Sequence, residues 1–379
     1  MKTKFSSCIS LILECCKITQ DITKIKELIP SINNWDDFID ISYAHGVFPL
    51  IYRTLKNFAD IISLDVLNEM KLYNMNIVKQ NMLMTAELIK VMNILEENGI
   101  EAIAFKGPTL SQMAYGNITR RQYADLDILI EDKDKTKAIN LLTSLHYQPE
   151  IILKENTKRS FYKDVNVIGF DNTHNNIYVE IHWGLISKNY AIDFSSLDLF
   201  KSRTITINQK SINLLSEENN LIYLAVHGSK HFFERVSWIC DIDRSIRTDT
   251  SLDWNLLLKK AQKIEVLKIL LVSLCISKRL FNTPLDIKVI KLIEADSSIE
   301  KIASEILDMQ TVNTQRSSKN FFLLLNMKDS FYKKMEFSVK AFTSTKYPDY
   351  EFYQLPSYLN FLYLFLRPIR LFIKYINFQ

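Results

Sequence analysis

Residues 99–130 read GIEAIAFKGPTLSQMAYGNITRRQYADLDILI, and the order of patterns in this stretch decides the fold. It begins with a short apolar run over residues 100–105, which predicts a β-strand. The KGP sequence at residues 106–108 predicts a tight turn, and residues 109–115 have the spacing of one or two helical turns. A second apolar run over residues 123–130 alternates with polar positions, which predicts another strand. The stretch therefore predicts a strand, a turn, a helix and a strand.

Two aspartates, Asp125 and Asp127, stand two positions apart in the second apolar run. Residues two apart in a strand point to the same face, with Cα atoms about 6.5 to 7 Å apart. Leu126 and Ile128 then face the core, while both carboxylates project together. Adjacent carboxylates repel each other unless a cation lies between them. The pair therefore predicts a site for a hard divalent cation that prefers oxygen ligands, Mg²⁺ or Mn²⁺.

A third acid, Glu180, lies in a later apolar run, VEIHW at residues 179–183. If this run forms the strand next to that of Asp125, about 4.8 Å away, Glu180 completes a cage of three carboxylates. Two metal ions about 4 Å apart in such a cage activate an attacking hydroxyl group and stabilise a leaving pyrophosphate. His182 shares the face of Glu180, and we interpret it as packing around that carboxylate.

Groups near the aspartate pair are suited to binding phosphate. Lys106 and Gly107 end the first strand, and the helix that follows begins with free amide groups, including that of Thr109, which can bind phosphate oxygens. Arg120 and Arg121 lie in a basic loop before the aspartates and add positive charge for a triphosphate. The sequence therefore predicts a nucleoside triphosphate (NTP) as co-substrate.

Helical patterns flank this mixed unit on both sides. Apolar residues at spacings of three and four predict that the long helix before it begins near Asp60 and ends at Gly99. Within the unit, residues 133–145 predict a helix, and residues 161–170 and 176–183 predict two more strands. We predict a helical N-terminal lobe at residues 1–98, a catalytic core at 99–206 and a helical C-terminal lobe at 207–309. A polar linker at 310–319 and a helical extension at 320–379 follow.

A second group of polar residues, HGSKH at residues 227–231, lies in the C-terminal helical pattern. The two histidines are four apart, as in zinc peptidases, but Gly228 stands where the catalytic glutamate of such an enzyme would be, which argues against one. One interpretation is that His227, Lys230, His231 and Arg235 form a wall of a nucleotide cleft. The other is that they form an interface between the lobes.

Asp241 and Asp243 form a second D-x-D pair. In a helical pattern, residues two apart point in different directions. We therefore interpret this pair as structural.

The composition favours a largely helical globular protein. Only 7 Gly and 8 Pro occur among 379 residues, too few for an all-β protein built on many tight turns. With 47 basic and 43 acidic residues, the charge is too balanced for a protein whose main role is to coat nucleic acid. The five cysteines lack C-x-x-C spacing, which favours a cytoplasmic location.

No segment reaches the roughly 20 apolar residues that a membrane-spanning helix needs. The C-terminal tail nevertheless places Arg370 and Lys374 among apolar residues. We favour a tail helix docked on its own domain; the alternative is peripheral contact of an amphipathic helix with a membrane surface.

Four blocks, in order along the chain, resemble a known family. They are FKGPTLSQMAY, ADLDILI, VEIHW and HGSKHFFERVSWICD, at residues 105–115, 124–130, 179–183 and 227–241. Together they are similar to the bacterial family of largely uncharacterised nucleotidyltransferases in the DNA polymerase β-like superfamily. The resemblance implies an α+β fold in which a small mixed β-sheet lies between N- and C-terminal helical lobes. It also implies that Asp125 and Asp127 are the metal-binding pair and that Glu180 is the third carboxylate.

The expected activity is transfer of a nucleoside monophosphate from an NTP to a hydroxyl-type acceptor, with Mg²⁺ or Mn²⁺ and with release of pyrophosphate. A small molecule, a peptide or protein side chain, and an RNA end are left open as the acceptor, and the modest basicity mildly disfavours nucleic acid. Two alternatives are a non-catalytic nucleotide-binding or scaffold protein on the same fold, and a metal-dependent phosphodiesterase or nuclease, since a carboxylate cage can equally activate water.

Overall fold

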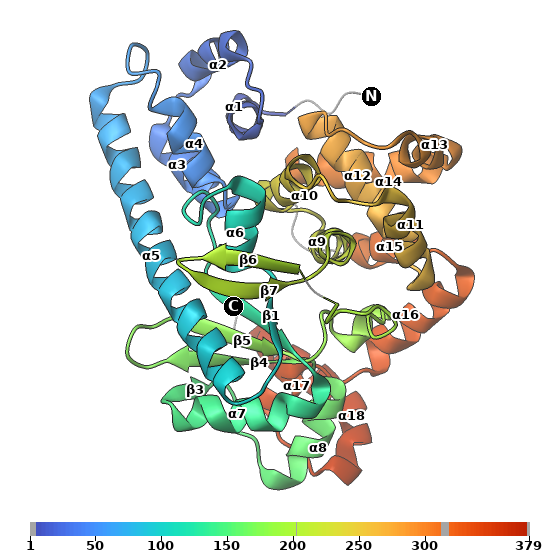
Figure 1. Cartoon of the computed structure of the whole chain (residues 1–379). Helices are drawn as coiled ribbons and strands as arrows, with labels where there is room; N and C mark the ends of the chain where they lie inside the picture. The colour runs from blue at the N-terminus through green and yellow to red at the C-terminus, as the bar shows by residue number, and fades with distance from the viewer. Residues whose placement is uncertain (1–4, 202, 312–317, 377–379) are drawn as a thin grey trace.

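The N-terminal part of the molecule is helical (Figure 1). The computed structural model describes residues 5–201, 203–311 and 318–376. The N-terminal helices are α1 (Ser7–Cys16), α2 (Ile22–Leu28), α3 (Trp35–Ala44), α4 (Phe48–Leu55) and α5 (Leu64–Glu97), with a short 3₁₀ segment η1 (Ile29–Ser31). The side chain of Ser63, and not the predicted Asp60, caps α5 by accepting a hydrogen bond from the Val66 amide. Gly99 ends the helix with a φ of 65°, as predicted.

A five-stranded mixed sheet lies beside α5. Its strands, in the spatial order β1-β2-β5-β4-β3, are β1 (Ala102–Ala104), β2 (Asp125–Ile130), β5 (Tyr178–His182), β4 (Val167–Asn172) and β3 (Tyr147–Pro149). Strands β2 and β5 are parallel, and the other neighbours in this sheet are antiparallel. The small mixed sheet and the flanking helices confirm the predicted α+β fold class.

The two faces of the sheet pack against different parts of the chain. Leu126 and Ile128 of β2 share one core with residues of α5 and of α7 (Lys135–Ser144), which follows the 3₁₀ segment η2 (Asp132–Asp134). Leu129, which points to the other face, shares a second core with residues of α6 (Gly107–Tyr115) and α9 (Glu217–Lys230). Because side chains alternate along a strand, the aspartates of β2 lie on this second face.

One expectation about the middle of the chain is wrong. Residues 161–170 do not form one strand: helix α8 (Glu155–Asp164) covers their first part and β4 the rest. A hairpin of β6 (Arg203–Ile207) and β7 (Lys210–Leu214), which the sequence analysis did not predict, precedes the C-terminal helices. The Asn213 side chain donates a hydrogen bond of 3.4 Å to the Ala102 carbonyl, which holds this hairpin beside β1.

The C-terminal half is helical, as expected. The 3₁₀ segment η3 (Lys188–Tyr190) precedes the hairpin, and α9 follows the hairpin. The remaining elements are α10 (Val236–Thr248), α11 (Trp254–Lys263), α12 (Leu267–Phe281), α13 (Ile287–Ala295), α14 (Ser297–Thr311), α15 (Ser318–Asn326), α16 (Phe331–Thr343), α17 (Tyr347–Phe352), η4 (Ser357–Leu362) and α18 (Tyr363–Ile376). The predicted linker at 310–319 lies mostly outside the described residues. Within the described ranges, every helix is too short or too polar to span a bilayer.

The N-terminal and C-terminal helices also contact each other directly. The Ser237 amide at the start of α10 donates to the His45 carbonyl at 3.1 Å, and the Arg244 guanidinium donates to the Cys16 carbonyl at 3.0 Å. One hydrophobic core runs through both sets of helices. The N-terminal helices and α10 are therefore packed in one common core.

Candidate active site

The acids of β2 and β5 lie side by side. The two strands are parallel neighbours, and Asp127 is the register partner of Glu180. The prediction that these strands lie side by side is therefore confirmed. The Asp127 carboxylate is fully buried, and its Oδ1 accepts a hydrogen bond of 2.8 Å from Lys106 Nζ. His182 Nε2 lies 3.2 Å from the same oxygen and 3.0 Å from Glu180 Oε2. His182 thus joins the two carboxylates.

This cluster has the donor set of a metal site. One ligand atom each from Asp127, Glu180 and His182 lie within 4.8 Å of one another. Oδ2 of Asp127 is buried and has no hydrogen-bond partner. A buried carboxylate oxygen that receives no donor is suited to a cation, and the carboxylate oxygens of Asp127 and Glu180 suit Mg²⁺ or Mn²⁺, whereas an imidazole ligand is more usual for softer transition-metal ions. His182, which we interpreted as packing, is therefore a further candidate ligand.

Asp125 lies at the start of β2, next to this cluster but outside the set of closest donor atoms. The charge of Asp127, together with burial, raises the pKa of Asp125 to about 6, although Lys106 partly opposes the effect. Burial would also raise the pKa of Asp127, but the neighbouring Lys106 and His182 outweigh it and hold that pKa well below its ordinary value. The two aspartates therefore repel each other in the absence of a cation, as the sequence predicted.

Lys106 is enclosed rather than exposed to solvent. Its ammonium lies 5.7 Å from the ring centroid of Phe105 and 5.5 Å from that of Tyr223, in addition to its bond with Asp127. Burial disfavours the charged amine, but Asp127 outweighs this effect and raises the pKa of Lys106 well above its ordinary value. The sequence analysis missed Tyr223, which precedes His227 by four residues on α9 and so shares its helix face.

The turn after Lys106 brings α6 against β2. Gly107 has a φ of 49°, and a Cβ atom at this position would lie 3.3 Å from the Asp125 carbonyl oxygen. Both features favour glycine. The buried Thr109 hydroxyl donates to the Lys106 carbonyl at 2.7 Å, so the predicted phosphate contact of Thr109 rests on its backbone amide.

The two arginines before β2 hold the structure together. Arg121 is buried and forms a bidentate ion pair with Asp241 of α10, with N–O distances of 2.8 and 2.9 Å, and the Tyr115 hydroxyl donates to the same carboxylate at 2.7 Å. Arg120 donates to the Tyr115 carbonyl at the end of α6. Neither arginine lies in the acidic cluster, although Arg121 contributes to the cleft beside it.

The second D-x-D pair is structural, as interpreted from the sequence. Asp241 faces Arg121, whereas Asp243 binds Arg247 at 2.8 Å and the Thr283 hydroxyl at 2.6 Å. The two carboxylates thus point to different neighbours, which is what a helix requires of residues two apart.

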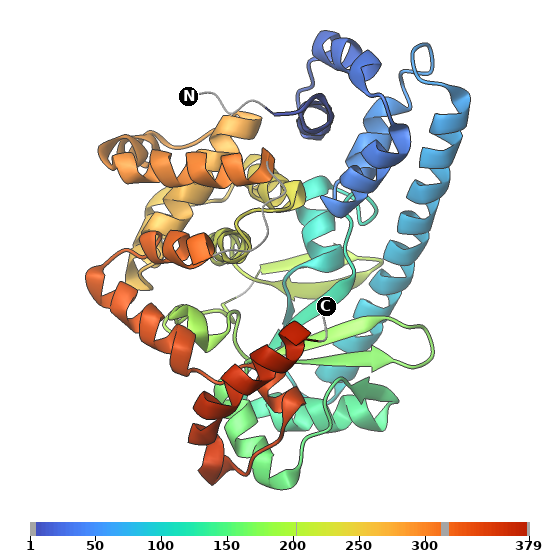
Figure 2. The same cartoon turned by 180° about the vertical axis from the view of Figure 1, so that it is seen from behind.

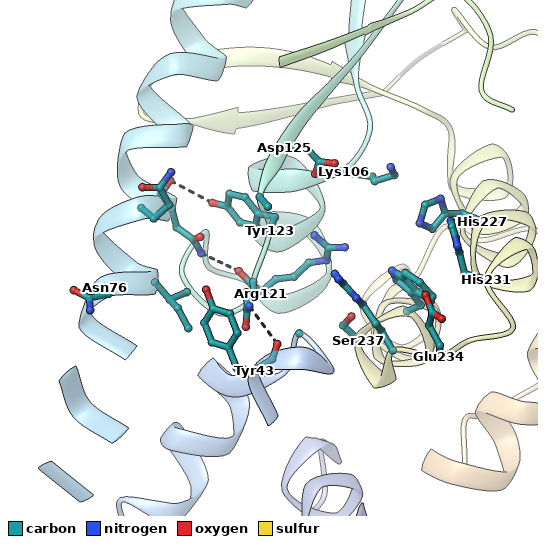
Figure 3. Close-up of a pocket in the computed structure, with 18 of the residues that line it drawn as sticks. Tyr43, Asn76, Lys106, Arg121, Tyr123, Asp125, His227, His231, Glu234 and Ser237 are labelled. Atoms are coloured by element: carbon teal, nitrogen blue, oxygen red, sulfur yellow. Dashed lines mark hydrogen bonds between the residues drawn. The ribbon is translucent and has the colours of Figure 1, made fainter. Parts of the chain in front are cut away.

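A cleft of about 680 Å³ opens from this site between the N-terminal helices and α10 (Figure 3). Asp125 and Lys106 lie at one end, His227 of α9 and His231, which follows α9, lie across the cleft from them, and Tyr43 lies on the N-terminal side. The other lining residues are Gly46, Tyr73, Asn76, Ile77, Gln80, Asn81, Arg121, Gln122, Tyr123, Ala124, Glu234, Arg235, Ser237 and Trp238. The volume lies within the range of about 300 to 1,000 Å³ that is usual for small-molecule sites.

The HGSKH segment lies partly on the cleft wall, and the ring contacts of its two histidines lie within the C-terminal helices. His227, His231 and Arg235 line the cleft, and the two histidine rings also pack on Trp238, with centroids 5.4 and 5.1 Å away. Lys230 does not line this cleft; its ammonium lies 5.6 Å from the ring centroid of Tyr190. Burial and the nearby charge of Lys106 lower the pKa of Lys230, and the acids Glu180 and Asp127 oppose that effect.

Comparisons with known proteins give one family match. A model of a family described as uncharacterised nucleotidyltransferase matches residues 31–282, whereas no curated protein matches significantly. Among solved structures, the chain is similar to the lincosamide antibiotic adenylyltransferase LnuA with lincomycin bound, at 15% identity over 42% of this chain and 94% of that chain, with a TM-score of 0.28. It is also similar to an antigenic nucleotidyltransferase-like protein from Paracoccidioides brasiliensis, at 14% identity over 60% of this chain and 96% of that chain, with a TM-score of 0.35. Because the family model spans more than half of the chain and includes the acidic cluster and the cleft, this protein belongs to the family of uncharacterised nucleotidyltransferases.

Proposed function

We propose that this protein transfers a nucleoside monophosphate from an NTP to a hydroxyl group of an acceptor, with divalent metal ions held by Asp125, Asp127 and Glu180. One observation carries the proposal: Asp127 and Glu180 are register partners on parallel strands, and Asp125, at the start of the same strand, opens into a cleft of about 680 Å³. Like-charged groups so close together are retained where a cation is to be bound.

The proposed reaction needs a base and a site for the leaving group. The acceptor oxygen attacks the α-phosphorus, the bond from this phosphorus to the bridging oxygen breaks, and pyrophosphate leaves. Glu180, whose side chain is 27% exposed, is less buried than Asp127 and can reach an entering hydroxyl group, so we assign it the proton of the acceptor. Bound Mg²⁺ or Mn²⁺ would supply activation of the hydroxyl group and charge neutralisation on the pyrophosphate.

The phosphate-binding assignments from the sequence become part of this proposal. We assign the phosphates to the turn of Lys106, Gly107 and the Thr109 amide, where α6 begins beside Asp125. Arg121 contributes positive charge from the cleft wall, and Arg120 supports the loop that carries it. We assign Lys230 to the acceptor or the phosphates, on the side of Glu180 and Asp127, the two acids that favour its charged form.

The acceptor is a small molecule, a peptide or a protein side chain in this proposal.

The division into a core at 99–206, helical lobes at 1–98 and 207–309 and an extension at 320–379 stays a prediction, as does a cytoplasmic location.

The proposal is tested by incubating the protein with each NTP, Mg²⁺ or Mn²⁺ and fractions of a cell extract, and by measuring pyrophosphate. We expect release with at least one NTP only when an acceptor fraction is present. Asp127→Asn should abolish release, whereas the matched control Asp132→Asn, at an exposed carboxylate beyond the end of the same strand, should not. Metal-dependent cleavage of phosphodiesters without an acceptor would favour the phosphodiesterase alternative. Lack of metal and nucleotide binding would favour a non-catalytic protein.

A further inference from the structure

Three arginines from different elements lie close together where the N-terminal helices pack against the C-terminal half. Arg53 lies in the last turn of α4, Arg120 in the loop between α6 and β2, and Arg244 in α10. Helix α1 packs on α4, and α6 packs on α10. In both Figure 1 and Figure 2, α6 lies between the N-terminal helices and α10. We name these three residues the arginine cluster.

Tyr115, at the end of α6, contacts two members of the arginine cluster. The Arg120 guanidinium donates a hydrogen bond of 2.9 Å to the Tyr115 carbonyl, and the Arg244 guanidinium lies 4.8 Å from the centroid of the Tyr115 ring. These two side chains therefore approach the same residue, one from the loop and one from α10.

The end of α1 connects Arg244 with α4, the helix of Arg53. Arg244 donates a hydrogen bond of 3.0 Å to the Cys16 carbonyl. The preceding carbonyl, that of Cys15, accepts a hydrogen bond of 3.3 Å from the Thr54 hydroxyl, and Thr54 directly follows Arg53. Successive carbonyls of α1 thus bind both elements.

The three positive charges act on one another. Burial and the charges of Arg53 and Arg244 lower the pKa of the Arg120 guanidinium from its ordinary value. Like charges at close range raise the free energy of the folded state unless an opposite charge lies among them.

Ion pairs within the protein do not supply that opposite charge. In the part of the chain that the structure describes, no member of the arginine cluster forms an ion pair, whereas the other buried or half-buried arginines each bind a carboxylate; these are Arg121, Arg203, Arg247, Arg367 and Arg370. Asp241 lies one turn before Arg244, but its oxygens bind Arg121 and Tyr115. In addition, Nε of Arg244 is buried and has no hydrogen-bond partner.

Helix ends account for only part of the charge. Arg53 lies at the end of α4, Arg120 binds the end of α6, and Arg244 binds the end of α1. Each helix C-terminus carries roughly half of a negative charge, so three such ends offset about half of the charge of three guanidinium groups. The remainder can bind an anion, and the planar fork of N–H donors on each guanidinium matches the oxygens of a phosphate.

We infer that the arginine cluster binds a phosphate group, either as inorganic phosphate or as the phosphoryl group of a small phosphomonoester. Arg53 is exposed and the other two side chains are half-buried, so the cluster can be reached from solvent. None of the three residues lines the cleft beside the acidic cluster. The inference is therefore independent of the proposed function.

The test is equilibrium dialysis of the full chain against radiolabelled orthophosphate at pH 7 and constant ionic strength. A chelator is present, so that no metal ion at the acidic cluster attracts the anion. We expect the parent protein to bind phosphate. Arg53→Gln and Arg244→Gln should each weaken this binding about tenfold or more, because each removes a charge-assisted contact.

Competition with glycerol 3-phosphate distinguishes the two forms of the ligand. Displacement of orthophosphate assigns the site to phosphomonoesters as well, whereas lack of displacement assigns it to the free anion. Circular dichroism establishes that each variant is folded. If Arg244→Gln is not, Arg53→Gln decides, because its side chain is exposed and makes no hydrogen bond within the described residues.

Arg235→Gln is the matched control. Arg235 is also an exposed arginine, next to the start of α10, but it lines the cleft and lies outside the arginine cluster. This variant has the same change of charge and should leave phosphate binding unchanged. The inference is overturned if the parent does not bind phosphate, or if Arg53→Gln binds it as tightly as the parent. It is also overturned if Arg235→Gln weakens binding as strongly as the cluster variants, since the anion then lies in the cleft.

Discussion

Replacing Asp125 with Asn removes one of two adjacent carboxylates from β2, and we expect the change to stabilise the metal-free protein. Asp127, together with burial, raises the pKa of Asp125 from 3.8 to about 6. A pKa difference of this size means that the ionised Asp125 lowers the free energy of unfolding by at most about 3 kcal/mol at pH 7. For a chain of this length, that free energy corresponds to an increase in melting temperature of about 4 °C.

The expected stabilisation depends on pH in a defined direction. Because the pKa of Asp125 is higher in the folded protein than in the unfolded chain, the folded state binds more protons between pH 3.8 and about pH 6. The parent protein therefore loses stability as the pH rises through this range. The gain in the free energy of unfolding of Asp125→Asn over the parent should be largest at pH 7, about half as large at pH 5, and absent below about pH 4.

The assay is thermal unfolding in chelator at several pH values, repeated with added Mn²⁺. The metal should raise the melting temperature of the parent and have little effect on Asp125→Asn, because a ligand stabilises only the state that binds it. Asp132→Asn, at an exposed carboxylate just after the strand, serves as the control and should change neither value. A variant that melts below the parent in chelator at pH 7, or that responds to Mn²⁺ as the parent does, would refute the reasoning.

Glu180→Gln should leave NTP binding nearly intact, measured by equilibrium titration, and lower turnover by a factor on the order of 10² to 10⁴, because the amide cannot accept the proton of the acceptor; a variant that loses NTP affinity and keeps its turnover would reverse the assignment. Lys230→Ala should weaken NTP or acceptor affinity about tenfold to a hundredfold with a nearly unchanged melting temperature, since a charge-assisted contact of about 1.5 to 3 kcal/mol is lost. A lower melting temperature with normal affinities would instead make Lys230 structural. Arg121→Ala should lower the free energy of unfolding in urea by about 3 to 5 kcal/mol, because the buried Asp241 loses its counter-ion. An unchanged unfolding midpoint would contradict this role.

The parts of the fold that depend on local sequence could be predicted. Alternation in residues 123–130 identified β2 and placed Asp125 and Asp127 on one face, and the apolar run around Glu180 identified β5. The residue that caps α5 was predicted wrongly because Asp60 and Ser63 both have capping side chains, and only the backbone geometry decides between them.

Other features depend on contacts between distant parts of the chain. Arg121 has the chemistry of a phosphate ligand, but its partner Asp241 lies on α10, and no local pattern shows that the two meet. His182 was interpreted as packing because its distance from Asp127 follows from the pairing of β2 with β5. Residues 161–170 were predicted as one strand because the apolar residues near Phe161 satisfy both a helical and an extended pattern over a short window.

The most direct test of the proposed activity compares NTP labelled at the α-phosphate with NTP labelled at the γ-phosphate, in the presence of Mg²⁺ or Mn²⁺ and an acceptor fraction. The account predicts that the α-label becomes attached to the acceptor and that the γ-label appears only in pyrophosphate. Both products should be absent with Asp127→Asn, because this substitution removes a carboxylate of the acidic cluster. Transfer of the γ-label to the acceptor, or equal transfer of the α-label by the parent and Asp127→Asn, would contradict the account.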